Sequence, residues 1–102
     1  ETYSILIKKN MNPDDFYNFV VGCGGMADTI LFKERFKKMK SKSKKIDAFL
    51  RIGAKDAKQA LLLSKDVLDE QFIFNATNKV FTKALAKGLS EEDVCNITEV
   101  YK

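Results

Sequence analysis

The chain has 102 residues, of which 45% are hydrophobic and 31% are charged, and its net charge is +4. This composition predicts one folded domain with a modest core, and excludes a disordered tail and a membrane-spanning run of ~20 apolar residues. The sequence has no histidine and two distant cysteines, Cys23 and Cys95. It therefore predicts no Cys/His zinc site and no histidine-activated nucleophile. Two unpaired thiols and no visible secretory leader predict a cytoplasmic protein whose cysteines fill the core.

The first half of the chain predicts three helices. The first helix is expected to end around Asn10. Asn12-Pro13-Asp14-Asp15 then supplies an asparagine cap, a proline at the first helical position and acids in the first turn, so a second helix begins there. Gly22-Cys23-Gly24-Gly25 predicts the end of that helix and a flexible corner. A third helix is expected from about Asp28 to Met39.

A strongly basic stretch follows, with eight lysines and arginines between positions 33 and 45 and a single acid. Phe32, Phe36 and Met39 recur there at i, i+4 and i+7, as on the core-facing side of a helix. The cations then fall on the solvated faces and in the following loop, which is the favoured interpretation. Contact with an anion or nucleotide stays open, and nucleic acid is the least favoured partner.

The second half of the chain predicts a pair of helices and a short last helix. The fourth helix is expected from about Gly53 to Leu68, and its small residues allow another helix to approach closely. The fifth is expected from about Asp69 to Lys87, ending at Gly88. Its predicted inward-facing residues are Ile73, Val80, Phe81, Ala84 and Leu85. Ser90-Glu91-Glu92-Asp93 resembles a capping box before the last helix. Six helices without a strand predict a compact all-α bundle.

The pair Lys55-Asp56 is expected in the first turn of the fourth helix. The helix dipole favours an aspartate at this end but not a lysine, because the potential there is already positive. A cation kept at such a position indicates a bound carboxylate or phosphate. The alternative is a surface lysine at a helix start. The acidic runs at 14–15 and 91–93 are explained by helix capping, so no metal site is predicted.

Three segments, in order, resemble the C-terminal helical domain of the β-hydroxyacid dehydrogenases. Residues 1–16, with Asn12-Pro13, are similar to the stretch that follows the interdomain helix of that family. Lys55-Asp56 before an apolar helix is similar to the family's K-D-L segment. Ala86 to Asp93 resembles its closing A-x-G-x-x-x-x-D segment. The resemblance covers nearly the whole chain, in matching order and approximate spacing.

The resemblance implies that residues 1–102 are a single helical domain, similar to the C-terminal domain of 6-phosphogluconate dehydrogenase, in a longer oxidoreductase. An upstream Rossmann domain would bind NAD or NADP, and the substrate would be a small 3-hydroxy acid or a related aldehyde or keto acid. The family's catalytic lysine lies upstream of this sequence. The chain alone is therefore expected to hold no catalytic residue, bind no cofactor and be inactive. Lys55, with Asp56 orienting it or capping the helix, is expected to contact the substrate carboxylate or the cofactor.

The resemblance also implies a homo-oligomer formed through the helical domain, in the cytoplasm and without membrane contact. An alternative function is a stand-alone basic helical module in which residues 33–45 bind an acidic partner or nucleic acid. A third interpretation is an oligomerisation domain without any ligand.

Overall fold

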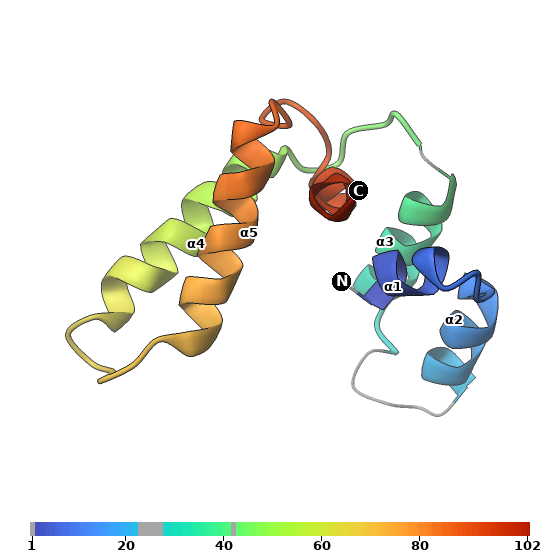
Figure 1. The fold of residues 1–102 in the computed structure, drawn as a ribbon, viewed down its shortest axis with the longest axis horizontal. Coiled ribbons are helices and arrows are strands. Elements are labelled where there is room, and N and C mark those ends of the chain that lie inside the picture. Colours follow the sequence, from blue (N-terminus) through green and yellow to red (C-terminus); the bar gives the residue numbers. More distant parts are fainter. Residues whose placement is uncertain (1, 23–27, 42) are drawn as a thin grey trace. The chain divides into compact units, whose positions relative to one another are not determined.

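The computed structural model describes residues 2–22, 28–41 and 43–102. Within these residues the chain forms five α-helices and one 3₁₀ helix, and its only β-type pairing is an isolated bridge, which confirms the predicted all-α class. The described part contains no helix long and apolar enough to cross a bilayer. The chain divides into two compact units, residues 1–43 with 101–102, and residues 44–100 (Figure 1).

The first unit contains α1 (Thr2–Lys8), α2 (Pro13–Gly22) and α3 (Ile30–Ser41). The predicted asparagine cap is confirmed, since Asn12 Oδ1 accepts the Asp14 N–H at 3.0 Å. Thr29 Oγ1 accepts the Phe32 N–H at 3.0 Å, so α3 begins two residues later than predicted. The predicted corner at positions 22–25 lies largely outside the described residues.

Phe36 of α3 is the centre of the first unit, with only 2% of its surface exposed. Four aromatic rings from the three helices surround it, with ring centroids between 5.2 and 6.2 Å away. These rings belong to Tyr3, Phe16, Tyr17 and Phe32. The predicted core-facing stripe of the third helix is therefore confirmed at Phe32 and Phe36.

Cations of the basic stretch form surface ion pairs. At least four of those that the structure describes contact a carboxylate, which favours the solvated-face interpretation. The pairs are Lys33–Asp28, Lys37–Glu34, Lys40–Asp14 and Lys45–Asp47. The hydrogen bond to Asp28, at 2.6 Å, raises the pKa of Lys33 above its ordinary value.

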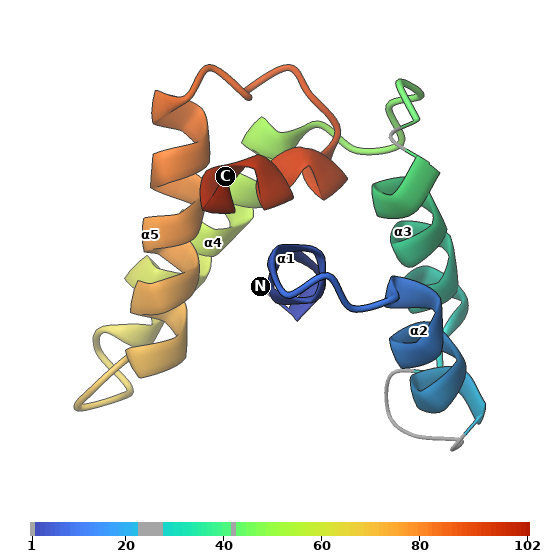
Figure 2. The same ribbon diagram turned by 45° about the vertical axis from the view of Figure 1, so that its right-hand side comes forward.

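The second unit is built on a helical hairpin of α4 (Leu50–Ser64) and α5 (Phe72–Ala86), followed by the 3₁₀ helix η1 (Val94–Tyr101) (Figure 2). The helix α4 begins three residues before the predicted start and ends four residues before the predicted end. The helix α5 begins three residues late, because residues 65–71 form the connecting loop. Gly88 ends α5 as predicted, with a φ of +78°.

The prediction of which residues of α5 face inward was partly wrong. Ile73 is 77% exposed and Leu85 is 40% exposed, although Ala84 is fully buried and Phe81 is half-buried. The reason is that Ile73 lies in the first turn of α5, next to the loop, where no other described element of this unit covers the hairpin.

Asp93 joins the start of α4 to the start of η1. Its side chain is buried, and its Oδ2 accepts the backbone N–H groups of Asp47 and Ala48 at 2.8 and 3.3 Å. Its Oδ1 accepts the N–H of Cys95 at 2.9 Å. The predicted capping box placed the cap at Ser90. The capping residue is Asp93 instead, and the Ser90 hydroxyl contacts Glu91.

The burial of Cys95 confirms the prediction that this thiol fills the core. Cys23 lies outside the described residues.

Backbone hydrogen bonds also fix the start of α4. Phe49 and Asp93 form the isolated bridge, and the Leu50 N–H donates to Glu92 O at 2.8 Å. These bonds explain why α4 begins where it does without a side-chain cap.

The backbone of α4 lies against the ring of Phe81 from α5 at Gly53. A Cβ atom at this position would lie 2.9 Å from the ring of Phe81. We expect Gly53→Ala to lower the free energy of unfolding by about 1 kcal/mol, because overpacking of about 1–3 kcal/mol exceeds the gain in helix propensity of about 0.5–1 kcal/mol. Urea denaturation measures the change. Gly22→Ala is the control, since open space surrounds that position. A more stable Gly53→Ala variant would contradict the tight contact.

Candidate anion-binding groove on α4 and α5

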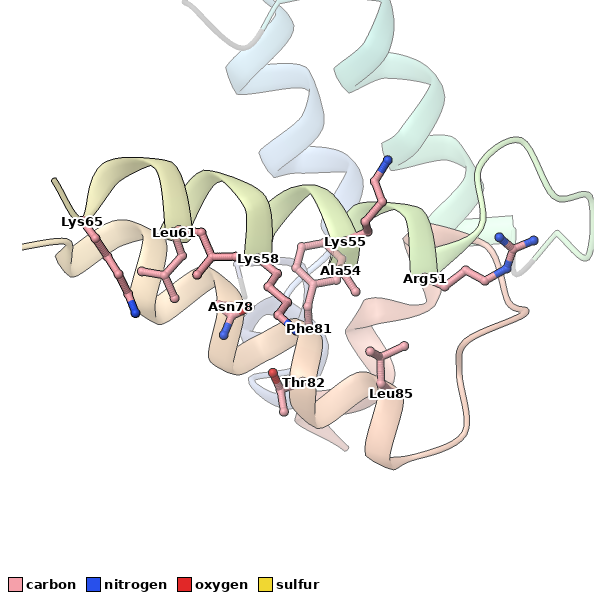
Figure 3. A pocket seen from close by; sticks show the side chains of 11 residues that line it. Arg51, Ala54, Lys55, Lys58, Leu61, Lys65, Asn78, Phe81, Thr82 and Leu85 are labelled. Atoms are coloured by element: carbon pink, nitrogen blue, oxygen red, sulfur yellow. The ribbon is translucent and has the colours of Figure 1, made fainter. Parts of the chain in front are cut away.

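A groove of about 540 Å³ lies between α4 and α5 (Figure 3). Its apolar floor comes from both helices and consists of Ala54, Leu61, Leu62, Phe81 and Leu85. On the α5 side, Asn78 and Thr82 add an amide and a hydroxyl one helical turn apart. The groove therefore offers apolar contact along its length and hydrogen-bonding groups on one wall.

Four cations line the other wall, and all come from α4 or its C-terminal cap. They are Arg51, Lys55, Lys58 and Lys65. Their spacings of four, three and seven residues match the 3.6-residue period, so they share one side of the helix. At 1.5 Å per residue the row is about 21 Å long. An elongated positive edge beside an apolar floor suits a ligand that is both acidic and apolar.

Two of these cations already contact a carboxylate of the chain. Arg51 Nε contacts Glu91 Oε1 at 3.0 Å, and its guanidinium lies 4.5 Å from the ring centroid of Phe49. Lys55 Nζ contacts Asp56 Oδ1 at 3.1 Å.

The other two cations, Lys58 and Lys65, carry the excess charge of the groove. Among the residues that the structure describes, no carboxylate lies within ion-pair distance of either ammonium. Both side chains extend towards α5, whereas the amine of Lys55 points away from it (Figure 3). An anion that binds over the floor of the groove would therefore meet Lys58 and Lys65 before the other two.

The predicted pair Lys55-Asp56 does not lie in the first turn of its helix. The two residues are the sixth and seventh of α4, in its second turn, so the unpaired N–H groups of the helix start are not beside them. The N-cap is Phe49, and Asp56 therefore does not cap the helix. Lys55 lies at the edge of the groove and is 68% exposed, while Asp56 is not part of the lining.

Sequence reasoning missed Lys58, Lys65, Asn78 and Thr82. The helical spacing of the four cations was readable from the sequence, but the spacing alone does not say which side of α4 borders another helix. In comparisons with known proteins, no protein-family model matches the chain, and no curated protein matches it. The function of the groove is therefore inferred from its own residues.

Proposed function

We propose that this chain is the C-terminal helical domain of an NAD(P)-dependent oxidoreductase of the β-hydroxyacid dehydrogenase type, with a fold similar to the C-terminal domain of 6-phosphogluconate dehydrogenase. The intact enzyme would act on a small 3-hydroxy acid or a related aldehyde or keto acid. The ordered segments around Asn12-Pro13, Lys55-Asp56 and Ala86 to Asp93 support this proposal. The observation that carries it is the ammonium of Lys55 on α4, whose side chain is 68% exposed and so is open to a substrate carboxylate.

The role proposed for Lys55 is to bind and orient the substrate. NAD(P) would supply the hydride acceptor in the intact enzyme, and the general acid and base would belong to the upstream domain. The ammonium of Lys55 would attract the substrate carboxylate and fix its position, which lowers the entropic part of the barrier. Asp56, 3.1 Å from that ammonium, would hold the side chain in place. This chain alone would then have no turnover.

We expect Lys55→Ala to reduce kcat/KM of the full-length enzyme by about 10- to 100-fold, because a hydrogen bond to a charged group contributes about 1.5–3 kcal/mol. Lys55→Arg should restore part of the activity, since it keeps the positive charge. The assay follows NAD(P)H absorbance with a series of small 3-hydroxy acids. Lys79→Ala, an exposed change on α5 outside the groove, is the control. Unchanged kinetics in Lys55→Ala would disprove the role.

We also propose that the helical domain forms a homo-oligomer. The loop end of the hairpin carries large exposed apolar side chains, and a surface of this kind is typical of an interface between protein chains. The residues are Leu63, Val67, Phe72 and Ile73. We also propose a cytoplasmic location, because the sequence has only two cysteines and they lie far apart along the chain.

A further inference from the structure

We infer that the groove between α4 and α5 is a docking site for an acidic amphipathic helix of a partner protein. The inference depends on Lys58 and Lys65, whereas the oxidoreductase proposal depends on Lys55. The residues that line the groove also differ from those of the apolar loop end of the hairpin, to which we assign self-association. The two proposals can therefore fail independently.

The charge of the groove calls for an acidic ligand with two negative groups. Arg51 and Lys55 have their own carboxylates, so the groove retains about two uncompensated positive charges, at Lys58 and Lys65. A ligand carboxylate beside each of these ammonium groups would form an ion pair with it. Asn78 and Thr82 provide further hydrogen-bonding groups on the opposite wall.

The floor of the groove requires the ligand to be apolar as well. Leu62 and Leu85, one from each helix, are 45% and 40% exposed, and Leu61 and Phe81 are half-buried between them. Two packed helices leave a groove into which the apolar face of a third helix fits, and many peptides are recognised in this way. A third helix would remove this apolar surface from water, which is favourable.

The spacing of the two lysines favours a helical peptide over a small metabolite as the ligand of the groove. Lys58 and Lys65 are seven residues apart, or about 10.5 Å along the helix axis. A partner helix that packs nearly parallel or antiparallel to α4 places two carboxylates seven residues apart at the same distance. A small 3-hydroxy acid carries one carboxylate and can reach only one of these ammonium groups. A helix can contact both and still cover the floor.

The test uses the full chain and a synthetic helical peptide of about 18 residues, which is longer than the row of cations. One face of the peptide carries leucines at i, i+3 and i+4, flanked by glutamates seven residues apart. A second peptide has glutamine in place of each glutamate. Fluorescence anisotropy of the labelled peptides measures the Kd at several salt concentrations. We expect the glutamate peptide to bind more tightly, with an affinity that falls as salt is added.

The decisive variant is Lys58→Glu/Lys65→Glu, for which we expect a Kd raised by roughly tenfold or more, because two attractive pairs become repulsive. Lys79→Glu/Lys83→Glu is the matched control. It changes the net charge equally on the exposed part of α5 outside the groove, so its Kd should stay within about twofold. Circular dichroism checks that both variants are folded.

Three results would overturn the inference. The first is no binding of the glutamate peptide at low salt. The second is an equal loss in both double variants, which would indicate attraction by net charge alone. The third is a change of oligomeric state in the single variant Lys58→Glu, whose substituted residue lies farther from the loop end, measured by sedimentation. It would show that a second copy of this chain occupies the groove.

Discussion

Replacing Asp93 with alanine is expected to lower the free energy of unfolding by about 3–5 kcal/mol. The carboxylate accepts three backbone N–H groups, from Asp47, Ala48 and Cys95. The buried N–H of Cys95 left without a partner costs about 1–3 kcal/mol, and the loss of the two part-buried bonds adds to this cost. Because domains are stable by only about 5–15 kcal/mol, a large share of the total stability is lost. Urea denaturation followed by circular dichroism measures this change.

Two further variants test whether the carboxylate itself is responsible. Asp93→Asn should lose less stability than Asp93→Ala, because its amide keeps one oxygen acceptor, although its NH₂ group then faces another donor. Glu92→Ala is the neighbouring control, since that exposed side chain contacts only Asn96 among the bonds described. An Asp93→Ala variant whose free energy of unfolding lies within about 1 kcal/mol of that of the parent protein would contradict the structural role, because even one unsatisfied buried N–H should cost as much.

The second large effect is expected for Phe36→Ala, which should lower the free energy of unfolding by about 3–5 kcal/mol. Phe36 is almost fully buried and contacts four aromatic rings from α1, α2 and α3. Removing its ring leaves a cavity that the surrounding rings cannot fill without leaving their own contacts. Hydrogen exchange followed by mass spectrometry should show faster exchange in the amides of α1–α3.

The same experiment tests whether the two units are independent. Amide protection in α4 and α5 should be retained in Phe36→Ala, because the four rings that surround Phe36 all belong to the first unit. Phe19→Ala is the control for loss of an aromatic ring, since Phe19 is largely exposed. Equal loss of protection in α4 and α5 would show that the chain unfolds as one cooperative unit instead.

Local signals in the sequence predicted most of the helices. The Asn12 cap and the glycine at position 88 each act within one turn of the chain, so their bonds are readable from neighbouring residues. The start of α4 was not readable in this way. Phe49 offers no side-chain cap, and the backbone there is held by the bridge to Asp93, more than forty positions away in the chain.

The same distinction between local signals and long-range contacts applies to the candidate site. The sequence alone determined the helical class, the aromatic stripe around Phe36 and the adjacency of Lys55 to a carboxylate, because residue spacing and adjacency are properties of a single helix. The tertiary structure decided which side of α4 meets α5. That packing makes Lys58 and Lys65 the uncompensated charges of a groove, since burial of an apolar floor depends on the position of the second helix.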